Sequence, residues 1–169
     1  MHTLYLLRHA KSSWSDPTLP DRERPLAPRG RRDAKRIAEH LLRLGIAPEL
    51  VLCSTSRRTR ETLELIRPAL ADSATVRLEA ELYAASAGTL LERLHGVPED
   101  VASAMLIGHN PGLQDLALLL ASAGSGLERL EAKFPTAALA TLALPAATWS
   151  RLARADALLD AYVVPRELD

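Results

Sequence analysis

The sequence predicts an α/β fold, a three-layer α/β/α sandwich in which helices cover both faces of a mostly parallel central sheet. Short apolar runs, typical of buried strands, alternate along the chain with amphipathic helical segments. The apolar fraction of 47% and the charged fraction of 25% are those of an ordinary globular protein. Since the 169 residues contain no repeat or linker, we expect a single domain over residues 1–169.

The first strand is expected over residues 3–7, an apolar run that stops abruptly at polar residues. Residues 12–29 follow no period and contain several prolines, so they read as a long loop, a kind that is often functional. Residues 31–44 place apolar side chains on one helical face, and Gly45 is a typical helix end.

A second buried strand is expected over residues 50–53, and the Ser/Thr cluster that follows it predicts a helix start. Pro68 should end that helix near residue 67. A third strand is expected around residues 76–78. Ser86 is then the predicted N-cap of a helix that Gly96 ends.

The fourth strand is predicted over residues 104–107, and it leads into a helix with Asn110 as N-cap and Pro111 at the first position. Residues 121–126 are small and predict a turn. Two further strands are expected, with a short helix near Trp149 between them, at residues 138–144 and 157–164.

Three of the predicted strands end in cationic or imidazole side chains. The first is followed by Arg8 and His9, the second by Arg57 and Arg58, and the fourth by His109. Ligands of an open α/β sheet bind outside the carboxyl ends of its strands, so these groups can converge on one crevice. Two of the junctions also open helices, whose N-termini favour anions. The sequence therefore predicts an anion pocket, and a carboxylate-poor one that does not resemble a metal site.

Bulk properties exclude several classes of function. With 21 basic and 21 acidic residues the net charge is zero, which argues against nucleic-acid binding. No apolar run approaches the roughly 18 residues of a membrane span, and the N-terminus lacks the features of a signal peptide. We therefore expect no membrane partner and a cytoplasmic location. The single cysteine, Cys53, rules out an internal disulfide and a cysteine metal cluster.

Four blocks of the chain together resemble the histidine phosphatase superfamily, which has the phosphoglycerate mutase-like fold. The short form with Arg-His-Ala and a Gly-His-Asn-Pro turn is similar to the bacterial SixA-type phosphohistidine phosphatases. The resemblance covers nearly the whole chain. The blocks are Leu7-Arg8-His9-Ala10-Lys11, Arg24-Pro25-Leu26 with Gly30, Ser54 through Thr62, and Gly108-His109-Asn110-Pro111-Gly112.

The resemblance implies that His9 is the nucleophile that accepts the phosphoryl group. It implies that Arg8, Arg58 and His109 bind the phosphoryl oxygens, and we expect His109 to be protonated when it does so. Arg58 rather than Arg57 is selected because the family's arginine lies four residues after the serine that follows the strand, here Ser54.

The remaining site residues are less sharply defined. The resemblance points to Glu81 as proton donor, with Glu79 or water as alternatives. Arg24 is either part of a solvated, ion-paired loop or reaches back over the anion site. Two more residues of the matched blocks, Lys11 and Asn110, are expected to bind substrate, as is Ser54.

The expected mechanism needs a neutral His9 with one ring nitrogen free and the other donating to a backbone carbonyl. Neighbouring guanidiniums should depress its pKa by like-charge repulsion. The arginines neutralise the phosphoryl charge, so we expect neither a metal nor a cofactor.

The leading functional hypothesis is a metal-independent phosphatase acting on phosphohistidine in a signalling or phosphotransfer protein. An imidazole leaving group has a reference pKa of about 6.5, so it needs little help from a general acid. The alternatives are a phosphatase of small phosphate monoesters, such as nucleotide or sugar derivatives, and a phosphate-binding module without turnover.

Overall fold

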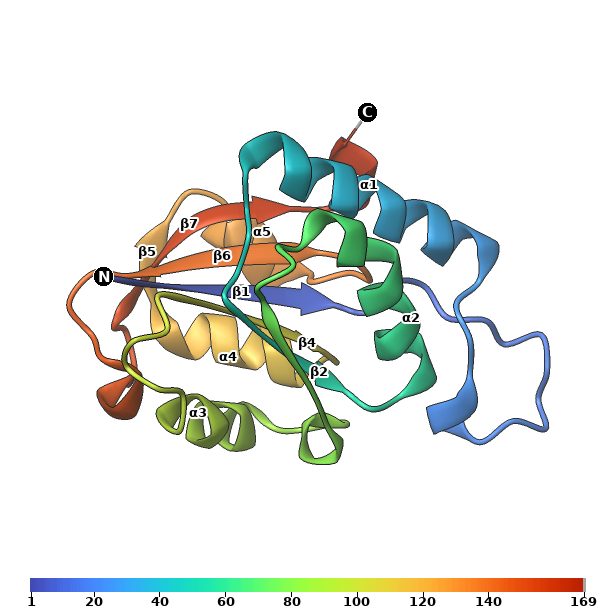
Figure 1. Ribbon diagram of the computed structural model, residues 1–169, viewed down its shortest axis with the longest axis horizontal. Helices are drawn as coiled ribbons and strands as arrows, with labels where there is room; N and C mark the ends of the chain where they lie inside the picture. The colour runs from blue at the N-terminus through green and yellow to red at the C-terminus, as the bar shows by residue number, and fades with distance from the viewer. Residues whose placement is uncertain (169) are drawn as a thin grey trace.

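The computed structural model describes residues 1–168 and contains one seven-stranded sheet flanked by helices (Figure 1). The strands are β1 (His2–Arg8), β2 (Leu50–Ser54), β3 (Thr75–Glu79), β4 (Ser103–Gly108), β5 (Ala121–Gly124), β6 (Leu139–Leu144) and β7 (Ala157–Val163). The helices are α1 (Pro28–Leu44), α2 (Arg57–Ile66), α3 (Ala87–His95), α4 (Gly112–Leu120) and α5 (Leu127–Ala132). None of these helices is long and apolar enough to cross a membrane.

The strand order is β3-β2-β4-β1-β6-β7-β5, which places β1 at the centre of the sheet. β6 runs antiparallel to β1 and β7, and every other neighbouring pair is parallel. The carboxyl ends of β1, β2, β4 and β7 therefore lie at one edge of the sheet. The predicted α/β class with a mostly parallel sheet is confirmed.

Helices cover both faces of the sheet, as the three-layer prediction requires (Figure 1). Leu4 and Leu6 of β1 belong to the core shared with α3, α4 and α5, while Leu7 belongs to the core shared with α1 and α2. This division follows from the alternation of side chains along a strand. The central strand is thus buried on both sides, and its polar end is left at the edge.

Helix α1 shows how the local sequence fixes an element. Ala34, Ile37 and Leu41 are fully buried, and their spacing forms the apolar face that the sequence predicts. Gly45 ends the helix in the left-handed conformation, with φ of 66°. The helix begins at Pro28, three residues before the predicted start, because proline suits the first helical position, where no N–H is needed.

The structure also contradicts the predicted start of α4 and the turn predicted at residues 121–126. Helix α4 begins at Gly112 with Pro111 as N-cap, and the peptide between Asn110 and Pro111 is cis. The Asn110 side chain still accepts the N–H of Gln114, at 3.2 Å, from outside the helix. Residues 121–124 form edge strand β5 instead of a turn, because their small side chains allow close pairing with β7. A Cβ on Gly124 would lie 2.2 Å from the Leu159 carbonyl oxygen.

Candidate active site

A cleft of about 280 Å³ opens at the edge where β1, β2 and β4 end. We refer to it as the cleft. Its walls come from the segments that follow β1, β2, β3 and β4, from the long loop between β1 and α1, and from the turn before β6. The lining residues are Arg8, His9, Lys11, Ser12, Trp14, Asp21, Arg24, Arg58, Tyr83, Ala84, His109, Asn110 and Thr136.

His9 directly follows β1 and is buried, with 6% of its surface exposed. Its Nδ1 lies 2.8 Å from the Ala10 carbonyl oxygen, which can only accept, so Nδ1 carries the proton and Nε2 keeps a free lone pair. Burial lowers the pKa of His9 to about 3, and His109, Arg58 and Arg8 add repulsion, against the raising effect of the bond to Ala10. The neutral imidazole is as predicted, but burial outweighs the guanidiniums as its cause.

His109 faces His9 from the end of β4, with the two ring centroids 5.4 Å apart. Its Nδ1 lies 3.5 Å from Arg58 Nη2, a donor, so Nε2 carries the proton and donates to Ser54 Oγ at 2.8 Å. Burial and Arg58 lower the pKa of His109 to about 4. In the structure the ring is therefore neutral at pH 7. The protonated His109 expected when a phosphoryl group is bound stays a prediction.

Arg58 reaches the cleft from the first turn of α2, while its neighbour Arg57 does not. The guanidinium of Arg58 donates to the Asp21 carbonyl oxygen at 2.8 Å and to Asp21 Oδ2 at 3.0 Å. Arg57 instead pairs with Glu61 at 3.0 Å on the outside of the helix. The Thr62 hydroxyl ties α2 to the segment that follows β1, since it accepts the Ala10 N–H at 3.0 Å.

Arg8 ends β1, and its Nη1 donates to the Phe134 carbonyl oxygen at 3.0 Å. Its buried Nε has no hydrogen-bond partner among residues 1–168. Burial and the positive charge of Arg58 lower the pKa of Arg8, and both residues line the same cleft. An anion between them would relieve this repulsion.

Asp21 and Tyr83 line the cleft but were not predicted as site residues. The Tyr83 hydroxyl donates to Asp21 Oδ2, and this bond is the main reason that the pKa of Asp21 is lowered and that of Tyr83 raised. The Tyr83 ring also meets His109 edge-on, with centroids 5.3 Å apart. Asp21 stands in a charge-dense part of the long loop, a signal that was available in the sequence; nothing local distinguishes Tyr83.

Arg24, Lys11 and Asn110 all lie in the cleft wall. Arg24 is 7% exposed and stacks on Trp14, with the guanidinium carbon 3.3 Å from the ring centroid. Its three nitrogens donate to Ser12 Oγ, the Ser13 carbonyl oxygen and Asp21 Oδ1. Arg24 is therefore ion-paired but buried, not solvated, and it holds the loop together beside the site. Its contact with a bound substrate stays a prediction.

The side chains of Lys11 and Asn110 differ in exposure and in hydrogen bonding. The Lys11 side chain is exposed. The Asn110 amide is occupied, since Nδ2 donates to the Phe134 carbonyl oxygen at 3.1 Å and to Gln114 Oε1 at 3.2 Å. The Asn110 side chain therefore links the turn after β4 to the Phe134 carbonyl oxygen, which also accepts the hydrogen bond from Arg8.

Two predicted site residues lie outside the cleft. Ser54 is fully buried behind His109, so it orients that ring and cannot touch a substrate. Glu81 is exposed in a short 310 turn, and Tyr83, two residues on, takes the position in the cleft. The competitor Glu79 is held by Arg93 at 2.6 and 3.0 Å.

No group of three or more His, Cys, Asp or Glu side chains that could hold a metal ion occurs within residues 1–168. The charged side chains that line the cleft are three arginines, Lys11 and Asp21, and two neutral imidazoles line it with them. Such a site suits a phosphoryl group: the guanidiniums can neutralise its oxygens while the free nitrogen of His9 meets the phosphorus.

Fold and site together define a phosphoryl-handling α/β protein of the phosphoglycerate mutase-like type. The chain belongs to the histidine phosphatase superfamily (branch 1), whose family model matches residues 4–106, more than half of its length. Its resemblance to the SixA-type members is confirmed by the structural comparison. Membership supports a phosphatase, a hydrolase of phosphoryl groups.

Three similar proteins illustrate this membership. The uncharacterized protein Rv1276c of Mycobacterium tuberculosis is 38% identical over 165 residues, which are 95% of this chain and 100% of that protein. A candidate phosphohistidine phosphatase SixA from Nakamurella multipartitia superposes with a TM-score of 0.83 at 32% identity, covering 97% and 96% of the two chains. The protein histidine phosphatase SixA complexed with tungstate has a TM-score of 0.79 at 24% identity, covering 99% of each chain.

Proposed function

We propose that this protein is a metal-independent phosphatase that removes the phosphoryl group from phosphohistidine in another protein, by way of a phosphorylated His9. Family membership supports the phosphatase class. The choice of phosphohistidine rests on the acid–base character of the cleft. A role in signalling or phosphotransfer follows from that choice of substrate.

The observation that carries this choice concerns Asp21, the only carboxylate among the described residues that line the cleft. Its pKa is lowered by Tyr83 and Arg58, so it is ionised at neutral pH and has no proton to give. An alkoxide leaving group needs a general acid. A phosphohistidine ring has a reference pKa of about 6.5, so it can take its proton from water and leave as neutral imidazole.

In the proposed first step, Nε2 of His9 attacks phosphorus as the substrate's N–P bond breaks, and the phosphoryl group becomes attached to His9. Arg8 and Arg58 would stabilise the oxygens during this displacement. The buried, unpartnered Nε of Arg8 and the place of both arginines in the cleft lining support these roles. The negative charge would also raise the pKa of His109, which could then donate to an oxygen.

In the second step, a water oxygen attacks the phosphorus of phosphorylated His9. The His9 N–P bond breaks, inorganic phosphate leaves, and the neutral ring is regenerated with its proton on Nδ1. The bond from Nδ1 to the Ala10 carbonyl would keep the ring in place through both steps. The protein histidine phosphatase SixA of the same fold has been solved with tungstate, an oxyanion, which is in keeping with a substrate that carries a phosphoryl group.

The test compares three substrates: a phosphohistidine protein, phosphoramidate, and an alkyl phosphate monoester. We expect both N–P substrates to be hydrolysed in excess chelator, with kcat/KM at least about tenfold above the monoester. Equal or faster hydrolysis of the monoester would contradict the proposed substrate class. Loss of activity with chelator would contradict metal independence.

A phosphatase of small phosphate monoesters is the second candidate. The Tyr83 hydroxyl favours it, because its raised pKa keeps a proton in the cleft, next to Asp21. In that case Tyr83→Phe would slow the monoester reaction by about tenfold or more and spare the phosphoramidate reaction. A module that only binds phosphate would hydrolyse none of the three substrates.

A further inference from the structure

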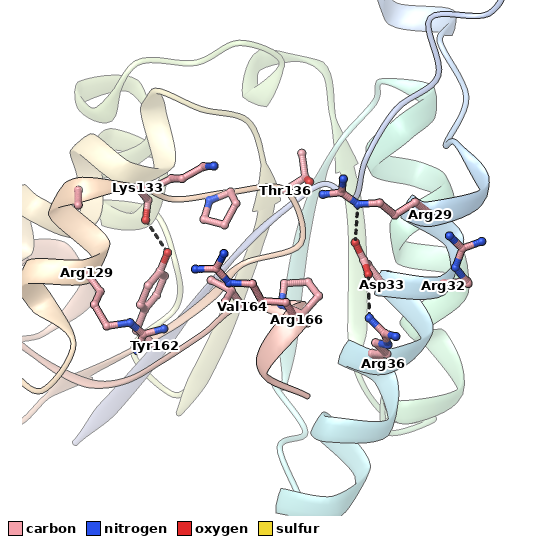
Figure 2. Close-up of a pocket in the computed structure, with 13 residues that line it drawn as sticks. Arg29, Arg32, Asp33, Arg36, Arg129, Lys133, Thr136, Tyr162, Val164 and Arg166 are labelled. Atoms are coloured by element: carbon pink, nitrogen blue, oxygen red, sulfur yellow. Dashed lines mark hydrogen bonds and ion pairs between the residues drawn. The ribbon is translucent and has the colours of Figure 1, made fainter. Parts of the chain in front are cut away.

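A second hollow, of about 670 Å³, lies beside the cleft between the start of α1 and the carboxyl end of β7 (Figure 2). We call it the basic groove. Its walls carry six cationic side chains and a single acidic one. The cations are Arg29, Arg32, Arg36, Arg129, Lys133 and Arg166, and the acid is Asp33.

The positive charge of the basic groove is only partly compensated. Asp33 lies between Arg29 and Arg36, with N···O distances of 3.7 and 3.5 Å (Figure 2). Arg129 pairs with Glu167 at 2.6 Å. Within residues 1–168, no carboxylate lies at ion-pair distance from Arg32 or Lys133, and the same is true of Arg166. The whole chain has a net charge of zero, so this surplus is local.

The basic groove shares a wall with the cleft. Thr136 lines both hollows, and the next residue, Ala137, donates its N–H to the carbonyl oxygens of Arg8 and His9, at 3.1 and 3.0 Å. Lys133 starts this wall, and its carbonyl oxygen accepts the Tyr162 hydroxyl at 2.5 Å (Figure 2). A ligand whose phosphoryl group enters the cleft therefore has the basic groove directly beside it.

The sheet topology brings Arg166 to the same edge as His9. β7 runs in the direction of β1, and Arg166 follows its carboxyl end, as His9 follows that of β1. Figure 2 shows Arg166 between the side of Lys133 and that of Arg29, in the groove. The segments that follow β1 and β7 therefore contribute to neighbouring parts of the same surface, the cleft and the basic groove.

We propose that the basic groove binds an acidic segment of the phosphorylated protein, next to its phosphohistidine. This inference rests on the proposed function and names the chemistry of the partner. Arg32, Lys133 and Arg166 are exposed, and long cationic side chains on a surface suit flexible pairing with Asp and Glu. Such complementarity steers encounter and lowers KM without touching the chemical step.

The test uses two peptides with the same phosphohistidine, one flanked by Glu and Asp and one by Ser and Gln, together with phosphoramidate. The variant is R32E/K133E/R166E. Its control is R77E/R151E/R154E, which makes the same charge change at exposed arginines that line neither the cleft nor the basic groove. Unchanged thermal melting of both variants checks that they fold.

We expect the unaltered protein to prefer the acidic peptide, and the groove variant to lose about tenfold or more in kcat/KM on it, through KM. The neutral peptide and phosphoramidate should be unaffected, and the control variant should behave as the unaltered protein. Added salt should weaken the preference for the acidic peptide.

Equal rates on the two peptides, or equal losses in both variants, would overturn the inference while leaving the proposed function intact. Tripolyphosphate provides another such outcome. If it inhibits phosphoramidate hydrolysis by the unaltered protein but not by the groove variant, then the groove binds a small polyanion and the inference is overturned. Failure of the unaltered protein on all three substrates would overturn the proposed function itself.

Discussion

The cleft and the basic groove are both rich in arginine, yet they hold it in different ways. In the cleft, the Arg58 side chain is 10% exposed and is fixed by two hydrogen bonds to Asp21. In the groove, the Arg29 side chain is 66% exposed, and its nearest carboxylate oxygen is 3.7 Å away. Fixed, partly desolvated donors can stabilise a transition state, whereas exposed and mobile ones can only attract and orient a partner. Substitutions in the cleft should therefore lower kcat, whereas substitutions in the groove should raise the KM for a protein substrate.

The largest effect is expected for His9→Ala. Loss of the nucleophile should lower kcat on phosphoramidate by about 10⁴-fold or more. Rapid quenching of the unaltered protein with radiolabelled substrate should trap an acid-labile, base-stable label that the variant lacks. The groove substitution Arg32→Ala is the matched comparison and should stay within about twofold. If the His9→Ala protein still acquired the radiolabel, another residue would be the one that accepts the phosphoryl group.

Arg58→Met should cost about 10²- to 10³-fold in kcat, because it removes a preorganised donor from the cleft. Arg57→Met offers a control one residue away, since Arg57 pairs with Glu61 outside the cleft. That variant should keep activity within about threefold. Equal losses in the two variants would mean that the α2 start as a whole, and not the guanidinium of Arg58, matters.

Stability should depend on pH through the two histidines of the cleft. Both histidines have a folded pKa, about 3 for His9 and about 4 for His109, below the unfolded value of about 6.5. The unfolded chain then takes up protons first as the pH falls. Their contribution is complete above pH 6.5 and is lost below it, by up to about 1.4 kcal/mol per pH unit for each ring.

Urea unfolding at pH 7, 6 and 5 measures this dependence. His9→Ala should flatten the decline of the free energy of unfolding relative to the unaltered protein. Identical slopes in the two proteins would show that His9 titrates near its ordinary pKa in the folded state. Lys133→Ala, in the groove, should leave the slope unchanged.

The smallest effect is expected for Glu81→Gln. The Glu81 side chain is exposed and does not line the cleft, so activity on both phosphoramidate and a monoester should stay within about twofold. Tyr83→Phe is the paired variant inside the cleft. A large loss on the monoester with Glu81→Gln alone would restore Glu81 as the proton donor.

The sequence predicts those parts of the site that follow directly from strand ends. Arg8, His9 and His109 come immediately after apolar runs, and Arg58 stands at a fixed distance from one. Their position at the edge then follows from parallel pairing alone. For the same reason the fold class and most element bounds are predictable from local patterns.

Residues that meet by long-range contact are not predictable in this way. Asp21 reaches Arg58 across 37 positions and Tyr83 across 62, and no local period marks either contact. The predictions that the structure contradicts have local causes. Glu81 resembles a motif position but is turned outward, and the small side chains of residues 121–124 allow strand pairing as well as a turn.

The two histidines differ in what holds them, and this has a consequence for mutational tolerance. His9 is oriented by the main-chain oxygen of Ala10, an atom that every amino acid carries. His109 is oriented by a hydroxyl, that of Ser54, which a single substitution can remove. A saturation library should thus contain variants at position 54 with a rotated second imidazole. At position 10, which is fully buried, Ala10→Gly keeps the main-chain oxygen and leaves the tautomer of the first ring untouched.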